Sequence, residues 1–111
     1  MNPPLPKINH IFHALGDPTR RAILDQLVER PASVSQLAKP LGITVTAVMQ
    51  HLQILEDAKL AHTEKLGRVR TCRIDPAGFR ALEKWVRGHR TAWEKKLDRL
   101  GEFLAEEDEK R

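Results

Sequence analysis

The chain has 111 residues, a formal net charge of +4 and an estimated isoelectric point of 9.6. This length predicts one domain with a modest core. It contains no run of roughly 20 apolar residues that would cross a membrane, and its start has no apolar signal segment. The single cysteine, Cys72, excludes a disulfide within the chain. We therefore expect a cytosolic protein.

The positive charge is concentrated in one part of the sequence. Residues 1–60 carry six Lys or Arg against five Asp or Glu, and residues 61–99 carry eleven against five. Residues 100–111 carry two against five, so the end of the chain is acidic. A basic middle segment favours an anionic partner, although charge alone does not separate DNA from an acidic protein.

The first part of the chain predicts two helices after an extended arm. Residues 1–7 are rich in proline and should be extended. Apolar residues recur at helical spacing over residues 8–16. Asp17 then provides an N-cap and Pro18 a first helical position, and Pro31 ends this second helix. Four side chains of the second helix are expected in the core: Ala22, Ile23, Leu27 and Val28.

Residues 35–58 predict a helix-turn-helix. Gly42 breaks the first of the two helices, and Thr44 caps the second. At the end of the second helix, Lys59 occupies a position that often needs a positive φ, and the sequence leaves open how that helix ends. The inward stripe of the second helix is Val48, Leu52 and Leu55. The side chains off this stripe are Thr46, Ala47, Gln50 and His51.

Residues 61–74 predict a β-hairpin that turns at Gly67 and carries a cluster of cations. A helix-turn-helix followed by a basic hairpin is typical of a winged-helix fold, mainly α with a small β-hairpin. Arg68 and Arg70 at the hairpin tip are placed to contact DNA phosphates. Gln50 can pair bidentately with adenine, and the alternative of a solvated helix residue is about as probable.

Residues 76–105 predict a long helix that begins at Asp75-Pro76 and is followed by an acidic tail over residues 106–111. Its apolar residues follow in steps of three and four, the pattern of a helix that packs on a partner. Dimerisation explains this stripe better than a cap on the helix's own domain, which is the alternative. The stripe consists of Leu82, Val86, His89, Trp93, Leu97, Leu100 and Leu104.

Three segments together closely resemble the ArsR family of bacterial winged-helix repressors, over residues 8–104. They are Ala14-Leu15-Gly16-Asp17-Pro18-Thr19-Arg20-Arg21-Ala22-Ile23-Leu24, Leu37-Ala38 and Ala47-Val48-Met49-Gln50-His51-Leu52. The resemblance implies a homodimer built on the first and last helices. It also implies a recognition helix in the major groove and a wing on phosphate or in the minor groove.

The site residues that follow from the resemblance and the pattern form two sets. The expected DNA-binding residues are Thr44, Thr46, Ala47, Gln50, His51, Lys65, Arg68 and Arg70. The expected dimer-interface residues are Ile8, Ile11, Phe12, Leu82, Trp85, Val86, His89, Trp93, Leu97 and Leu100.

No metal, cofactor or catalytic residue is expected. The chain lacks the Cys-x-Cys element and the last-helix pattern of Asp, His and Glu that metal-sensing members carry, and so resembles members without an evident metal site. Its five histidines are scattered and have no companion Cys or carboxylate at the spacing of metal ligands, which argues against a metal site. No nucleophile with a base, carboxylate pair or phosphate loop stands out. Cys72 is expected to be a half-buried strand residue. Trp85 and Trp93 could line a small-molecule pocket. Aromatic residues at helical spacing more often belong to a core or an interface, so the pocket is the minority interpretation.

Two functions from different classes remain. The first is a homodimeric transcriptional repressor that binds an inverted-repeat operator, with autoregulation as an open question. The second is a protein-interaction module that uses the winged-helix surface and the terminal helix. A protein-binding surface would show exposed apolar anchors on the second helix of the helix-turn-helix, so the polar residues there favour the first.

Overall fold

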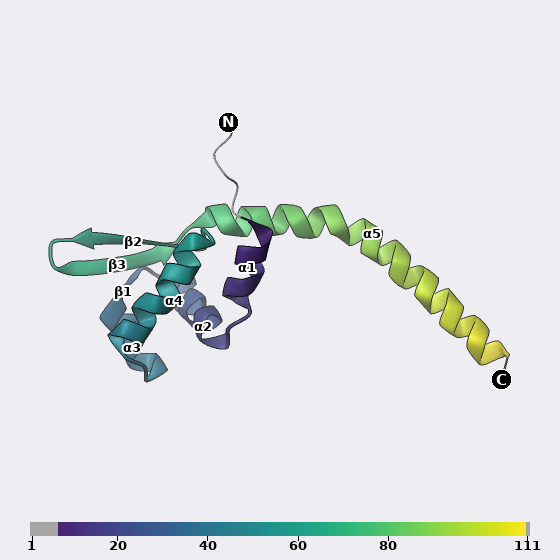
Figure 1. Ribbon diagram of the computed structural model, residues 1–111, viewed down its shortest axis with the longest axis horizontal. Coiled ribbons are helices and arrows are strands. Elements are labelled where there is room, and N and C mark those ends of the chain that lie inside the picture. The colour runs from purple at the N-terminus through teal and green to yellow at the C-terminus, as the bar shows by residue number, and fades with distance from the viewer. Residues whose placement is uncertain (1–6, 111) are drawn as a thin grey trace, which may run out of the picture.

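The computed structural model describes residues 7–110, which form five helices and a three-stranded antiparallel sheet (Figure 1). The mainly α winged helix-turn-helix fold is confirmed. The predicted arm lies outside the described residues except for Lys7, whose backbone is extended. The elements are α1 (Ile8–Leu15), α2 (Pro18–Glu29), β1 (Ala32–Ser33), α3 (Val34–Leu41), α4 (Val45–Asp57), β2 (Ala61–Leu66), β3 (Val69–Ile74) and α5 (Pro76–Glu109).

Helices α2 to α5 each begin where a side-chain oxygen accepts a hydrogen bond from a free backbone N–H. Asp17 Oδ2 accepts from Arg20 N at 2.9 Å, and Thr44 Oγ1 accepts from Ala47 N at 3.0 Å. Asp75 caps α5 in the same way. These three starts are confirmed. Ser33, which was not predicted, caps α3 through a reciprocal capping box with Gln36.

Strand β1 was not predicted, because two residues are too few to show an alternating pattern. It pairs with β3, with Ala32 opposite Cys72 and Ser33 opposite Thr71, so the strand order is β1-β3-β2. This short strand joins the start of α3 to the base of the hairpin. Cys72, at the centre of this pairing, is fully buried rather than half-buried.

The core forms where α1, α2, α3 and α4 meet the base of the sheet. Ile23 and Leu27 of α2 are buried as expected. Val28 is 69% exposed, so its placement in the core was wrong. Leu24 is buried in its place, because it precedes Leu27 by three residues and shares its face.

The end of α4 is joined tightly to the start of α5. Lys59 has φ +59°, so α4 ends in a left-handed residue and the open question about this helix end is resolved. Gly78 N donates to Lys59 O at 2.7 Å. A Cβ at residue 78 would lie 2.6 Å from the carbonyl oxygens of Ala58 and Lys59, so this position requires glycine.

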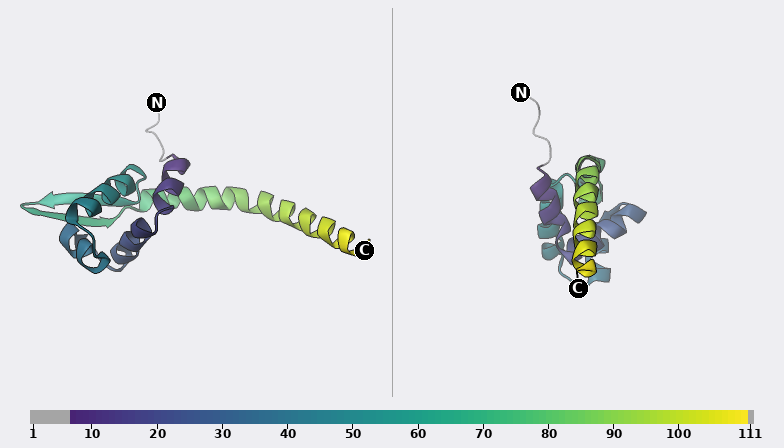
Figure 2. Two further views of the ribbon diagram at one scale, coloured as in Figure 1. Left: turned by 60° about the horizontal axis from the view of Figure 1, so that its bottom comes forward. Right: turned by 90° about the vertical axis from the view of Figure 1, so that its right-hand side faces the viewer.

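Helix α5 is longer than expected, because residues 106–109 of the acidic tail continue the helix. Its first half lies beside α1, and its second half projects from the domain as a single curved rod (Figures 1 and 2). From Trp93 onward every described side chain of α5 is exposed. No helix among residues 7–110 combines the length and apolar character that a membrane crossing requires.

Candidate nucleic-acid interface

Helix α4 presents a polar outer face beside its buried stripe. Val48, Leu52 and Leu55 are at most 2% exposed, which confirms the predicted inward stripe. The outward side chains form two rows at helical spacing. One row consists of Thr46, Gln50 and Gln53, and the other of Val45 and Met49.

The apolar row and Gln53 were missed in the sequence. Val45 is 41% exposed and Met49 is 43% exposed. The signal was available, because residues four apart that avoid the inward stripe must face outward together. Gln53 donates a hydrogen bond from Nε2 to Asp57 Oδ1 at 3.0 Å. The side-chain amide of Gln50 has no hydrogen-bond partner among the described side chains. Ala47 is half-buried.

His51 does not lie on this outer face, which corrects the expectation. Its side chain is 25% exposed and turns toward α2. Its Nδ1 atom lies 3.4 Å from Arg20 Nη1 and 3.9 Å from Asp17 Oδ2. The backbone N–H of Arg20 holds the pKa of Asp17 below its usual value, and the charges of Arg20 and His51 act in the same direction. His51 therefore belongs to a polar contact inside the domain.

Arg20 is a buried residue next to the site that sequence reasoning missed. It is only 7% exposed, and it donates from Nε to Ala14 O at 2.8 Å and from Nη2 to His13 O at 2.9 Å. These carbonyls lie in the last turn of α1, where His13 O also accepts a hydrogen bond from Gly16 N at 3.2 Å. The guanidinium thus joins α1 to α2 and reaches His51 on α4. An arginine near the start of a helix is usually exposed, and nothing in the sequence around Arg20 indicates that its side chain is buried.

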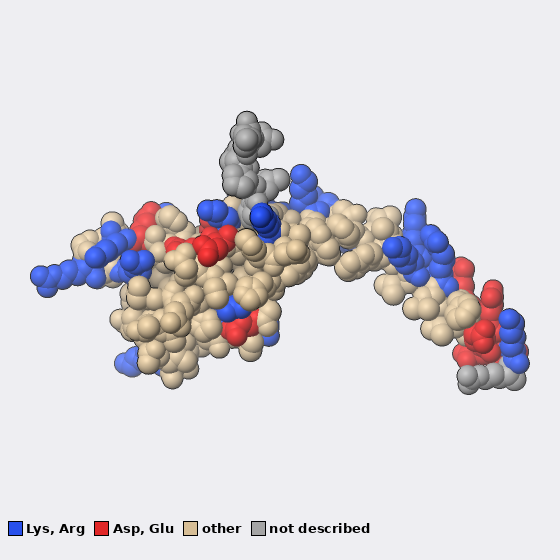
Figure 3. All heavy atoms as spheres, in the orientation of Figure 1, with Lys and Arg blue, Asp and Glu red and all other residues tan. Residues whose placement is uncertain are grey.

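The hairpin of β2 and β3 forms the wing. Gly67 has φ +63°, which suits the first position of a two-residue hairpin turn. Lys65 and Arg70 are directly opposite each other, and Arg68 lies in the turn. All three are exposed, and none is in an ion pair with another residue of the described chain. Figure 3 shows the resulting basic tip of the molecule.

The wing is fixed relative to α4. Glu56 Oε1 of α4 accepts hydrogen bonds from Thr63 N at 2.7 Å and from Thr63 Oγ1 at 2.5 Å. Side chains alternate along a strand, so Lys65 and Arg70 face the same side of the hairpin as Ala61 and Cys72, which pack on the core. Side-chain hydrogen bonds thus hold the wing, on the core side of its cationic tip, against α4.

The expected dimer-interface residues fall into three groups. Ile11 is fully buried in its own domain and has no surface to offer, so it was wrongly assigned. Ile8, Leu82 and Trp85 are half-buried against the domain. The exposed group consists of Phe12, Val86, His89, Trp93, Leu97 and Leu100, and it is joined by Leu104 and Phe103, of which Phe103 was not predicted.

An aromatic cluster links α1 to α5. The ring of Trp85 packs edge-on against Phe12, with 5.0 Å between ring centroids, and edge-on against Trp93, with 5.5 Å between centroids. It stacks on His89, with a centroid distance of 4.1 Å. The His89 Nδ1 atom lies 2.8 Å from Trp85 O. The rings pack on one another rather than surround a cavity, so a small-molecule pocket between Trp85 and Trp93 has no support here.

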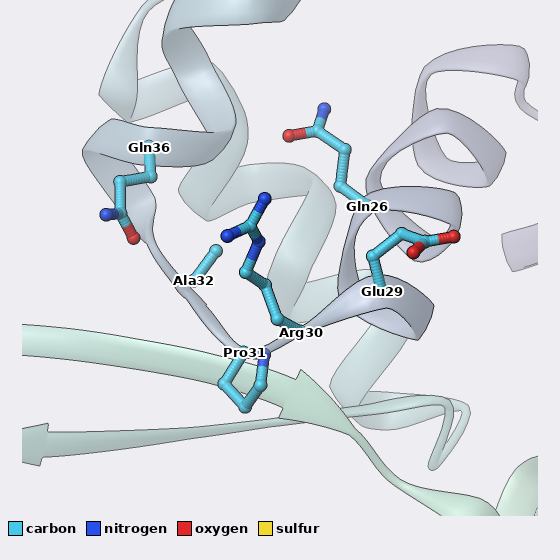
Figure 4. A pocket seen from close by; sticks show the side chains of 6 residues that line it. All are labelled: Gln26, Glu29, Arg30, Pro31, Ala32 and Gln36. Atoms are coloured by element: carbon cyan, nitrogen blue, oxygen red, sulfur yellow. The ribbon is translucent and has the colours of Figure 1, made fainter.

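A shallow surface hollow lies elsewhere, between the end of α2 and the start of α3 (Figure 4). Its lining mixes polar and apolar surface and is open to solvent, and it includes Gln26, Arg30 and Gln36 but neither tryptophan. Among residues 7–110 no three His, Cys, Asp or Glu side chains come together as a metal site.

A helix-turn-helix with an exposed polar recognition helix and a basic hairpin defines a winged-helix DNA-binding protein. A helix-turn-helix domain family matches residues 15–64. A curated relative, the HTH-type transcriptional regulator Rv2034 of Mycobacterium tuberculosis, is 41% identical over 71 residues, which make up 64% of this chain and 66% of that protein. The chain thus spans just under two thirds of that relative's length.

Solved structures are similar over more of the chain. An ArsR family transcriptional regulator shares 45% identity, with a TM-score of 0.74, over 85% of this chain and 97% of the other. The homodimeric winged helix-turn-helix domain of a possible ArsR-family regulator from Mycobacterium bovis shares 26% identity, with a TM-score of 0.60, over 76% and 81% of the two chains. The chain belongs to the ArsR family of winged helix-turn-helix transcriptional regulators.

Proposed function

We propose that the protein is a homodimeric repressor that binds an inverted-repeat operator in the cytoplasm. The observation that carries this proposal is the basic wing tip of Lys65, Arg68 and Arg70, held in fixed relation to α4 by Glu56. In this arrangement α4 enters the major groove while the wing cations contact the backbone beside it. A dimer bound over a promoter represses by occupying the DNA that transcription needs.

The dimeric state is supported by the exposed apolar stripe of α5 and by the homodimeric relative from Mycobacterium bovis. A two-fold dimer presents two recognition helices to half-sites about one helical turn apart, which is why the operator should be an inverted repeat. The alternative of a protein-interaction module has weaker support. The exposed apolar residues of α4, Val45 and Met49, stand beside a polar row and a basic wing, which suit DNA better than a protein surface.

The test is a gel shift on the DNA upstream of the protein's own gene, with a transcription assay on the same fragment. We expect a shift that an unlabelled operator competes away and a scrambled duplex does not, with reduced transcription from the bound fragment. Added zinc, nickel or copper should leave the shift unchanged. Binding that is equal on all duplexes, or release by stoichiometric metal, would contradict the proposal.

A further inference from the structure

The recognition helix lacks the side chains that read guanine. Residues 40–58, which include all of α4, contain no Lys or Arg. His51 is turned away toward Arg20 and Asp17. The outward side chains are the polar row of Thr46, Gln50 and Gln53 and the apolar row of Val45 and Met49.

These two rows match the major-groove edges of adenine and thymine. Arg or Lys reads guanine through O6 and N7, whereas a Gln amide pairs bidentately with adenine N6 and N7. Apolar groups contact the C5-methyl group of thymine. Gln50 and Met49 are adjacent, so an amide and an apolar group reach neighbouring positions of one site.

We propose that each operator half-site is A·T-rich where α4 enters the major groove. In this assignment Gln50 reads an adenine, and Met49 with Val45 contacts thymine methyl groups. The inference rests on the proposed function, because it specifies the DNA that the repressor recognises. The wing cations add affinity without adding this base preference.

The test begins with selection of duplexes from a randomised pool by the purified protein. We expect A·T enrichment at the centre of each half-site. Gln50→Ala should lose about tenfold of the preference for adenine at one position per half-site, consistent with the energy of one bidentate contact. Gln53→Ala is the matched control, because Gln53 already bonds Asp57. It should keep the preference.

Thymine-to-uracil replacement tests the methyl contact directly, because it removes only the C5-methyl group. The wild-type protein should bind the uracil duplex less tightly, and Met49→Ala should show a smaller difference between the two duplexes, because only Val45 then remains to contact the methyl groups. A G·C-rich half-site centre, or an unchanged preference in Gln50→Ala, would overturn the inference. Failure to bind any duplex would instead overturn the proposed function.

A second inference comes from the spacing of the α5 stripe. The residues on either side of Trp93 lie at the same distances from it. Val86 and Leu100 are seven residues away, and His89 and Leu97 are four residues away. Leu82 and Leu104 complete the pattern at eleven residues. The spacing of the stripe is therefore the same in both directions from Trp93, which suits two antiparallel copies related by a two-fold axis at that residue.

The flanking residues fit the same register. The stripe repeats every eleven residues, which is three turns of the helix. On a helix with this repeat, Arg90 and Glu94 lie on one flank of the stripe, and Trp85 and Phe103 lie on the other. Arg90 already pairs with Glu94 of its own helix at 2.9 Å, and in an antiparallel pair it also comes near Glu94 of the partner subunit, which is opposite in charge. Phe103, 56% exposed in one chain, comes near Trp85 of the partner subunit. Leu82 is partly covered by its own domain, so the contact is closest between residues 86 and 100.

We infer that α5 pairs antiparallel with α5 of a second copy, with the two-fold axis at Trp93. This inference specifies the interface of the proposed dimer. Helix axes that pack 8–10 Å apart bring Cα atoms on the facing line to roughly 4–5 Å, within reach of a disulfide. Cysteine substitutions along the stripe therefore report which residues face each other.

Five cysteine variants decide the register under mild oxidation. Trp93→Cys should cross-link to its own copy. Val86→Cys alone should not, but mixed with Leu100→Cys it should form a cross-linked pair, and His89→Cys with Leu97→Cys should do the same. The wild-type protein is the control, because its Cys72 is buried.

Self-cross-linking of Val86→Cys and of Leu100→Cys would indicate parallel helices and overturn the register. So would the absence of both mixed cross-links in variants that sediment as dimers. A wild-type protein that sediments as a monomer would overturn the proposed dimer itself, which separates the two failures.

Discussion

The wing arginines should set the salt dependence of DNA binding. Lys65, Arg68 and Arg70 have no ion-pair partner among residues 7–110, so each is available to a phosphate. Arg73, on the same strand, is already paired with Glu64 at 2.8 Å. Changing Arg68 and Arg70 to Ala removes four phosphate contacts from a dimer, provided that each arginine binds one phosphate.

Each lost contact makes the slope of log K against log salt shallower by about 0.9, so the slope should change by about 3.6. Between 50 and 200 mM salt, wild-type affinity should therefore fall about 150-fold more than that of the double variant. Fluorescence anisotropy on a labelled operator and a scrambled duplex measures both slopes. The loss should be similar on both duplexes, because phosphates carry no sequence information.

Arg73→Ala is the matched control, since its cation is engaged by Glu64, and it should change the slope far less. A double variant that keeps the wild-type slope would place the wing away from the DNA backbone. An equal effect of Arg73→Ala would show that general charge, rather than the position of the tip, sets the salt dependence.

Three further predictions concern the dimer, the join between α4 and α5, and the buried thiol. Leu97→Glu should sediment as a monomer and lose operator binding while keeping its helical content by circular dichroism. A dimeric variant that binds normally would place Leu97 outside the interface. Gly78→Ala should lower the free energy of unfolding by about 1–3 kcal/mol, because its Cβ meets the Lys59 carbonyl. Gly88→Ala, in open space within α5, should raise it by up to about 1 kcal/mol, and urea denaturation would compare the two. Burial, with a smaller contribution from the nearby carboxylate of α4, raises the pKa of Cys72 from 9.0 to about 11, so the folded state keeps its proton longer than the unfolded chain. Stability should then fall by about 2 kcal/mol as pH rises from 9 to 11, and Cys72→Ala should lack that fall.

Much of the fold follows from local signals in the sequence. Asp17, Thr44 and Asp75 begin helices because short polar side chains satisfy the free N–H groups of a first turn. The α4 stripe and the Gly67 turn follow from periodicity and from the need for a positive φ. These signals depend only on residues close in the chain, which is why they could be read without a structure.

The remainder depends on contacts between distant residues. Ile11 and Phe12 both look apolar in sequence, but only the packing of α1 shows that Ile11 is buried and Phe12 is half exposed. His51 lies off the inward stripe of α4, yet Arg20, 31 residues earlier, draws it toward the domain. Gly78 is required by the carbonyl of Lys59, a contact that forms only when α5 meets the end of α4.

The contacts of Arg20 lead to a last prediction, on the spacing of the half-sites. Phe12 of α1 packs on Trp85 of α5, and the last carbonyls of α1 accept hydrogen bonds from Arg20, which also meets His51 on α4. A continuous series of packed and hydrogen-bonded groups thus runs from the dimer helix to the recognition helix. In the proposed dimer, the distance between the two recognition helices should therefore be set by these contacts and not by a flexible joint.

Inserting base pairs between the half-sites should for this reason weaken binding steeply. Each added pair turns one half-site by about 35° relative to the other, since a helical turn contains about 10–10.5 pairs. An insertion of five pairs places the second half-site on the opposite face, where the second subunit cannot reach it. Gel shifts with operators carrying insertions of two, five and ten pairs measure this dependence. Equal affinity for all three would show that the two subunits move independently, and that the contacts through Arg20 do not hold the recognition helices at a fixed spacing.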